Sequence, residues 1–326
     1  MKKNIILSFD YELFFGEDSG TILKSIIIPT NLLLDTLENN GLRGNFFVDC
    51  CMFWALEGLE DDIARDDLAH LKDQLRDIIR RGHRIELHLH PHWIDAQYLG
   101  DGRWDFSNFL HYSLSSFSEE EVTNYIVNGA NYLNEIAREV QKDYAICAFR
   151  AGGWAIQPFA NLKRGFKLAH IRIDSSVASG AYGKNQYSFF DFTNAPKLSH
   201  WHFCNDVCKP DNNAPFLEVP ITSFHRGFFY RVIDGIHRKV STDLFPISDG
   251  THRRKDLIEA HHPSRSKNVA MMTFSKLSPF SVLISFLLCK SNTITFIDHP
   301  KDLSLSLVTS MSWISKYSNC IMYKDL

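Results

Sequence analysis

Short apolar runs alternate with longer stretches of helical periodicity along the first two hundred residues of the chain. Between residues 67 and 81 the apolar positions recur three and four apart, as on one face of an amphipathic helix. Ser118, followed by Glu121 three positions later, forms a capping box that predicts the start of another helix. We expect helices over 29–40, 67–81, 118–140 and 302–314, and strands over 4–9, 45–48, 84–90, 144–149, 167–173, 216–220, 269–274 and 293–297.

The alternation of strands with helices of ten residues or more is typical of parallel βα units. About seven such strands predict an α/β fold, namely a distorted or incomplete (β/α) barrel of the TIM type. We expect a single domain over residues 1–326, with insertions near 93–117 and 175–267, where the alternation is lost.

Composition narrows the class of protein. The 326 residues carry a net charge of −3, and 44% hydrophobic and 22% charged residues are ordinary for a globular protein. This excludes dominant disorder and a strongly basic nucleic-acid binder. The longest apolar run, 280–289, has about half of the ~20 residues of a spanning helix, so no membrane anchor is expected. Asp10 and Glu12 interrupt the apolar start before a signal-peptide core forms, which favours a cytoplasmic protein.

The seven cysteines form no evident disulfide framework. Cys204 and Cys208, with His200 and His202 nearby, could form a zinc clip, but the spacing is loose and no second pair follows. Reduced thiols are therefore expected.

Histidines gather at the end of the predicted strand 84–90, in the sequence GHRIELHLHPHW. His88, His90 and His92 lie two residues apart around a proline turn, at the strand end where active sites of parallel α/β folds form. Imidazoles at this spacing predict a metal site, which a carboxylate would complete. Asp10 and Glu12 end the first strand on one face and are candidates for that carboxylate.

Two further strand ends carry polar residues. Arg150 emerges from an apolar run in AFRAGGW, and a buried arginine needs a carboxylate partner, for which Asp10 and Asp174 are candidates. The late strand ends in TFIDHP, which brings Asp298 and His299 to the same edge.

Five of these segments follow one another in a recognisable order. FDYE, HLHPH, FRAGGW, IDSS and IDHP, which together span Ser8 to Pro300, resemble the five motifs of the polysaccharide deacetylase family, the NodB-homology group of carbohydrate esterases. The chain looks most like the branch found in surface-polysaccharide and O-antigen gene clusters. This resemblance implies a distorted (β/α) barrel that uses a divalent metal ion to remove acyl groups from amino sugars.

The resemblance also implies the metal ligands. Asp10 corresponds to the catalytic base and Glu12 to a metal ligand, although the Asp-Tyr-Glu order leaves an exchange of these two roles open. His88 and His92, four residues apart, match the histidine pair that binds the metal, with Zn²⁺ as the expected ion. His90 is an additional candidate ligand.

The remaining motifs imply the groups around the metal. Arg150 matches the arginine that holds the base carboxylate, and Asp174 falls where an acidic partner for that arginine is expected. His299 matches the general acid that protonates the leaving amine.

The aromatic residues of two motifs, Trp93 and Trp154, are expected to wall the sugar pocket. The third motif departs from the family, in which an aromatic residue follows Arg-x-Pro, because two glycines stand in place of the proline here. The backbone amide that stabilises the oxyanion therefore belongs to Gly153 or Trp154.

Together these features predict a hydrolase that removes an N-acetyl or N-formyl group from an amino sugar of a surface-polysaccharide or lipopolysaccharide precursor. The expected partner is an acylated amino sugar that is linked to a nucleotide or a lipid. The stretch 225–267, with nine Lys or Arg and five His, would suit a phosphate-linked substrate, although a solvated helical face gives the same pattern.

Two alternatives remain open. His88 and His90 also form an HxH pair like that of amidohydrolases which cleave cyclic amides, although those enzymes carry the pair on the first strand and not on the third. The other alternative is a non-catalytic barrel that binds glycans or a partner protein, with the altered first and third motifs as signs of lost activity.

Overall fold

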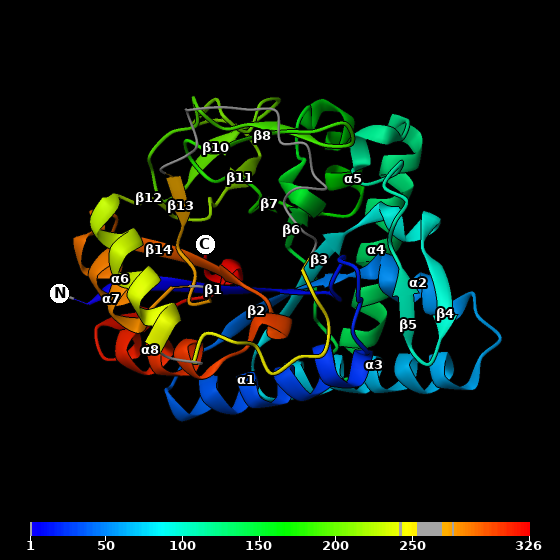
Figure 1. Cartoon of the computed structure of the whole chain (residues 1–326). Helices are drawn as coiled ribbons and strands as arrows, with labels where there is room; N and C mark the ends of the chain where they lie inside the picture. Colours follow the sequence, from blue (N-terminus) through cyan, green and yellow to red (C-terminus); the bar gives the residue numbers. More distant parts are fainter. Residues whose placement is uncertain (1, 241–242, 253–268, 276) are drawn as a thin grey trace.

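A curled, mostly parallel sheet forms the centre of the protein, which the computed structural model describes over residues 2–240, 243–252, 269–275 and 277–326 (Figure 1). Its nine strands are β1 (Lys3–Tyr11), β2 (Gly44–Asp49), β3 (Arg84–Leu89), β6 (Ala148–Ala151), β7 (Ile173–Asp174), β10 (Trp201–Phe203), β11 (Phe216–Glu218), β14 (Thr293–Asp298) and β15 (Ser318–Cys320). They follow the order β10-β11-β7-β6-β3-β2-β1-β14, and β15 also pairs with β1. Every neighbouring pair is parallel except β10 and β11.

Helices cover the outside of this sheet (Figure 1). They are α1 (Ile28–Asn39), α2 (Cys50–Glu57), α3 (Asp62–Arg80), α4 (Glu119–Arg138), α5 (Lys163–Leu168), α6 (Phe228–Val240), α7 (Pro279–Leu288) and α8 (Leu305–Ser315). Neighbouring helices pack together: α7 contacts α8, α8 contacts α1, α3 contacts α2 and α4, and α4 contacts α5. The result is a mixed α/β fold whose curled parallel sheet is compatible with the predicted distorted barrel.

Short helical turns join the longer elements. They are η1 (Leu23–Ile27), η2 (Pro91–Asp95), η3 (Leu114–Ser116), η4 (Gly152–Trp154), η5 (Phe159–Asn161), η7 (Pro300–Asp302) and η8 (Tyr323–Asp325). Three of them, η2, η4 and η7, directly follow strands of the central sheet, and they therefore shape the edge at which those strands end.

Irregular backbone completes the sheet beside β14. The N–H of Thr222 donates to the carbonyl of Thr295 (3.0 Å), and the N–H of Ile297 donates to the carbonyl of Met272 (3.0 Å). Next to them, β12 (Ser223–His225) and β13 (Val269–Met271) pair with each other in an antiparallel ribbon. Of the barrel strand predicted over 269–274, residues 269–271 thus form a strand of this ribbon, and Met272 contacts β14 through its backbone.

The strand predicted over 167–173 is wrong. Helix α5 occupies the first part of this segment, and β7 keeps only its last residue together with Asp174. Leu162 and Phe166 are both buried and lie four residues apart, which is the spacing of one helix face. Burial of these two side chains therefore favours a helical turn over an extended strand.

The predicted insertions contain small elements of their own. The first holds the hairpin of β4 (Gln97–Gly100) and β5 (Arg103–Asp105). The second holds the hairpin of β8 (Tyr182–Lys184) and β9 (Phe189–Asp191), together with β10 and α6. Much of the basic stretch falls within 253–268, which lies outside the described residues. The single domain over the whole chain stays a prediction.

Local signals in the sequence agree with the structure. At the start of α4 the N–H of Ser118 donates to the carboxylate of Glu121 (2.8 Å), and the N–H of Glu121 donates to Ser118 Oγ (3.3 Å), so the capping box is confirmed. All seven cysteines are free thiols. None of the helices in the described ranges combines the length and the apolar character that crossing a bilayer requires.

Candidate active site

Polar side chains from four parallel strands meet at the carboxyl edge of the sheet. β1 brings Asp10, β3 brings His88, β6 brings Arg150, and His299 directly follows β14. His88 and Arg150 are register partners on adjacent strands. Asp10, His88 and His299 line a pocket of about 320 Å³, so residues that are far apart in the sequence share one cavity at this edge.

Arg150 holds Asp10 inside the sheet. Its Nη1 lies 2.5 Å from Asp10 Oδ1, Nη2 donates to Ser8 Oγ (2.8 Å), and Nε donates to the carbonyl of Ser175 (2.8 Å). The guanidinium is fully buried and stacks over the ring of Phe47 at 4.2 Å. Burial opposes the charge of Arg150, but the carboxylate of Asp10 outweighs it and raises the pKa of the guanidinium. The guanidinium therefore remains charged, and it occupies Asp10 Oδ1.

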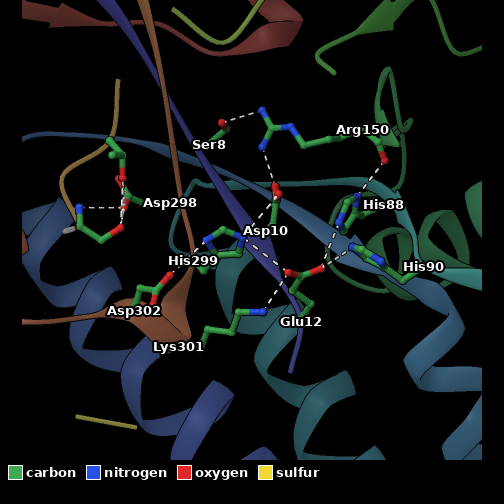
Figure 2. A network of polar contacts seen from close by, with 12 residues as sticks. Ser8, Asp10, Glu12, His88, His90, Arg150, Asp298, His299, Lys301 and Asp302 are labelled. Atoms are coloured by element: carbon green, nitrogen blue, oxygen red, sulfur yellow. Dashed lines mark hydrogen bonds and ion pairs between the residues drawn. The ribbon is translucent and has the colours of Figure 1, made fainter. Parts of the chain in front are cut away.

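Glu12 and two histidines form a group of metal-binding type. Glu12 Oε2 lies 3.2 Å from His88 Nε2 and 2.8 Å from His90 Nε2, and all three ligand atoms fall within 4.8 Å of one another. Figure 2 shows the carboxylate of Glu12 between these two rings on one side and Lys301 on the other. This is the only such group of three or more His, Cys, Asp or Glu among the described residues.

A hydrogen bond to the backbone fixes which ring nitrogen of His88 is available to a metal ion. Its Nδ1 lies 2.7 Å from the carbonyl of Arg150, which can only accept, so Nδ1 carries a proton and Nε2 is the nitrogen that could bind a metal ion. Two imidazoles and a carboxylate are a donor set that divalent ions such as Zn²⁺ prefer. The residues present therefore fit a metal ion.

The charges in this group are strongly coupled. Burial would raise the pKa of Glu12, but Lys301, His90 and His88 hold it well below its ordinary value. Burial would lower the pKa of His88, but Asp10, Glu12 and Asp49 raise it to about 9. Without a metal ion, a proton on His88 thus compensates the carboxylates that surround it.

His299 reaches both carboxylates from the far side of the pocket. Its Nε2 lies 3.8 Å from Asp10 Oδ2 and 3.5 Å from Glu12 Oε1. Its Nδ1 lies 3.4 Å from Asp302 Oδ2, and the other oxygen of Asp302 lies 2.5 Å from His252 Nε2 (Figure 2 labels Asp302 and His299). Asp302 thereby orients the ring of His299 with Nε2 toward the cavity.

Trp93, which was expected to wall the pocket, is placed elsewhere. Its indole N–H donates to Asp49 Oδ2 (2.7 Å), and its ring packs edge-on against Trp104 and Phe106. Asp49 ends β2, and its Oδ1 also accepts from the backbone N–H of His90 (3.0 Å). Trp93 therefore anchors the turn after β3 and is not among the residues that line the pocket.

His92 does not join the group formed by Glu12, His88 and His90. The turn η2 begins right after His90 and carries the ring of His92 onto Phe109, which it stacks against at 5.7 Å, and onto Phe15. The structure thus brings His90, the additional candidate, into the position that the sequence assigned to His92. The reason is the strand itself, because residues two apart point to one face until the proline turn ends the alternation.

Gly153 and Trp154 border the pocket, as expected. Both have a φ of +58°, a left-handed backbone that is strained for tryptophan. A Cβ at Gly153 would lie 2.6 Å from the ring of Tyr112, so only glycine fits. The turn η4 is therefore a special backbone feature at the mouth of the site.

Asp174 interacts with Arg150 through its charge, but its hydrogen bonds go to other residues. Its carboxylate accepts from the N–H (3.1 Å) and Oγ (2.8 Å) of Ser176 and shares a hydrogen bond with Glu218, whereas Arg150 pairs with Asp10. Both Asp174 and Glu218 are fully buried, and burial, together with the charge of Asp174, raises the pKa of Glu218 well above its ordinary value. Burial raises the pKa of Asp174 as well, so this pair of carboxyl groups favours binding a proton.

Sequence reasoning missed several residues of the site. Lys301 and Asp302 directly follow the IDHP motif, and Asp49 and Glu218 each stand at a strand end, so position alone could have pointed to all four. His252, which lines the pocket, comes from the second insertion and carries no such signal.

Comparisons with known proteins find similar solved structures. No protein-family profile and no curated protein sequence matches this chain. The structure is similar to a protein from Mycobacterium smegmatis that is named as a polysaccharide deacetylase (13% identity, TM-score 0.48), with 98% of this chain and 86% of that chain covered. It is also similar to a family 4 carbohydrate esterase from Streptomyces lividans (9% identity, TM-score 0.41), with 97% and 87% covered. The chain resembles polysaccharide deacetylases in structure.

The similar structures include another kind of carbohydrate enzyme. A family 57 branching enzyme from Thermococcus kodakaraensis is similar over 97% of this chain and 68% of that chain, with 10% identity and a TM-score of 0.45. Similarities of this size concern the course of the chain, so the chemistry has to follow from the side chains described above. The branch from O-antigen gene clusters stays a prediction.

Proposed function

We propose that the protein is a metal-dependent hydrolase that removes an N-acetyl or N-formyl group from an amino sugar. One observation carries this proposal: the group of Glu12, His88 and His90 shares its pocket with a second carboxylate, Asp10, and a third imidazole, His299. A donor set for a metal ion, a general base and a general acid thus border the same cavity.

Glu12, His88 and His90 would hold the ion, and Zn²⁺ suits two imidazoles and one carboxylate. When bound, a divalent ion supplies Lewis-acid polarisation of an amide carbonyl and of a water molecule. The proposed division of roles makes Glu12 the ligand and Asp10 the base. It is supported by the approach of both imidazoles to Glu12 and not to Asp10.

Asp10 is the proposed base. Arg150 occupies Oδ1, so Oδ2 remains to accept a proton from the attacking water. The water oxygen bonds to the amide carbon, and a backbone N–H of η4 donates to the oxyanion. His299, oriented by Asp302, then gives a proton to the nitrogen as the carbon–nitrogen bond breaks, which yields the free amine and the carboxylic acid.

The proposed substrate is an amino sugar of a surface-polysaccharide or lipopolysaccharide precursor, linked to a nucleotide or a lipid. Phe109, Trp154 and Tyr187 border the pocket, and aromatic rings of this kind pack against the apolar faces of sugars. The basic composition of 225–267 supports a phosphate-linked precursor. The cytoplasmic location stays a prediction from the sequence.

Metal content of the purified protein tests this proposal first. We expect about one equivalent of zinc or another divalent ion in the wild type and its loss in His88→Ala and His90→Ala. His92→Ala is the matched control and should retain the ion, because His92 lies outside the group. Loss in His92→Ala with retention in His90→Ala would instead restore the ligand pair expected from the sequence.

Activity is the second readout. The metal-loaded wild type should release acetate or formate from acylated, nucleotide-linked amino sugars. No bound metal, even after reconstitution, would sink the hydrolase mechanism. Bound metal without hydrolysis of any acylated amino sugar would favour the glycan-binding or partner-binding barrel.

A cyclic amidase is the second candidate, because the structure groups His88 with His90 as in an HxH pair. Against it, the pair lies at the end of β3, while β1 carries Asp10 and leads into Glu12. Preference of the metal-loaded protein for cyclic amides over acylated amino sugars would establish this alternative.

A further inference from the structure

Lys301 is a buried cation at the metal-binding group, and no step of the proposed reaction uses it. It lies in η7, directly after His299, and is 3% exposed. Its Nζ donates to Glu12 Oε1 (2.8 Å) and to the carbonyl of Leu13 (2.6 Å). The ammonium also lies over the rings of Phe14 and Phe15, at 5.3 and 5.0 Å.

These contacts compensate a charge that is rarely buried. Lysine is almost never fully buried without a partner, because removing an ammonium from water is costly. Here a carboxylate, a carbonyl and two aromatic faces, all from residues 12–15, surround the ammonium. The segment that follows β1 is therefore wrapped around Lys301, and Glu12 is held from two sides.

Lys301 divides the two oxygens of Glu12 between different partners. Oε1 faces Lys301, whereas Oε2 faces His88 and His90, and Figure 2 shows the carboxylate spanning the two sides. Asp10 is held in the same way, because Arg150 binds its Oδ1. Each carboxylate thus has one oxygen fixed by its own buried cation and presents the other oxygen to the pocket.

We propose that Lys301 is a positioning residue that restricts Glu12 to a single oxygen as a metal ligand. This inference rests on the proposed function. A second oxygen of Glu12 on the ion would occupy a coordination position that a catalytic site keeps open for water or substrate. Lys301 also competes with His299 for Glu12 Oε1, at 2.8 against 3.5 Å, and so leaves His299 Nε2 for the leaving amine.

Cobalt substitution tests this role with a readout that is independent of activity. Co²⁺ absorbs visible light more weakly as its coordination number rises, so the spectrum reports how many oxygens Glu12 contributes. In Lys301→Met we expect Co²⁺ to bind, its visible absorption to weaken, and kcat to fall by up to about 100-fold, as misplaced catalytic groups can cause. In Lys301→Arg, which keeps a cation and N–H donors, the absorption should be recovered.

Lys3→Met is the matched control. Lys3 also uses its ammonium to bind backbone carbonyls, those of Phe286 (2.7 Å) and Cys289 (2.5 Å), but at the opposite end of β1. It should leave both the cobalt spectrum and kcat unchanged. If folded Lys301→Met binds Co²⁺ with the wild-type spectrum, this inference falls while the proposed function stands. If the wild type binds no Co²⁺, both fall together.

Discussion

Replacing Arg150 with methionine should remove the buried cation that binds Asp10 at the base of the pocket. The change deletes the ion pair with Asp10 and the hydrogen bonds to Ser8 and Ser175, and it leaves a carboxylate that is only 4% exposed without its partner. Removing one partner of a buried ion pair typically lowers the free energy of unfolding by ~3–5 kcal/mol. That is a large share of the ~5–15 kcal/mol by which folded proteins are stable.

A double-mutant cycle separates the pair from its surroundings. In the Arg150→Met background the further change Asp10→Asn should be much less harmful than in the wild type, because it removes an uncompensated buried charge. We expect a coupling energy of ~1.5 kcal/mol or more, measured by urea unfolding of the metal-free variants. Additivity within ~0.5 kcal/mol would refute the reasoning, since it would show that the two charges do not depend on each other.

The chain offers a matched control for this experiment. Arg84 Nε lies 2.7 Å from Glu86 Oε1, in a second buried pair on β3 that does not border the pocket. Arg84→Met should therefore cost a similar amount of stability and leave the specific activity of the folded protein intact. Arg150→Met should lose both.

Two further predictions concern single histidines. His299→Ala should lower kcat on the true substrate by ~100-fold or more while the metal content stays unchanged, and an unchanged rate would remove His299 from the mechanism. His83 is buried and accepts a hydrogen bond from the N–H of Gly44 (3.0 Å), and burial, with the charge of Arg43, lowers its pKa to about 4. Because the unfolded chain binds the proton more readily, stability should be full above pH 6.5 and fall by ~3 kcal/mol toward pH 4. His83→Gln should flatten this dependence in urea unfolding at pH 5 and 7, and an equal fall in both proteins would contradict it.

The gathering of residues from different strand ends was predictable, because parallel strands place their carboxyl ends at one edge of the sheet. Asp10, Arg150 and His299 could be expected together from the sequence for this reason, and the structure brings them together. Helices with caps and clear periodicity, such as α4, were predictable as well. These features depend on spacing within one segment and on the regular geometry of βα units.

What could not be predicted depends on contacts between segments. The sequence HLHPHW does not show whether His90 or His92 faces Glu12. This depends on where the strand ends and on the hydrogen bond that the backbone N–H of His90 donates to Asp49. The position of Lys301 just after His-Pro places it near the site but does not name Glu12 as its partner, because that contact depends on β14 lying beside β1. Trp93 lies outside the pocket because its indole N–H donates to the other oxygen of Asp49, Oδ2.

The pairing of β1 with β14 joins two strands that the ribosome makes at very different times. Ser8 Oγ, beside Asp10, donates to the carbonyl of Phe296, which is 288 residues away along the chain. At a translation rate of roughly 5–20 residues per second, the first strand leaves the ribosome roughly 15–60 s before its partner exists. During that time the apolar residues of β1 have no neighbour on that side, and His299 and Lys301 have not been made. One edge of β1 therefore stays unpaired until β14 has been made, and catalysis cannot begin before His299 has been synthesised.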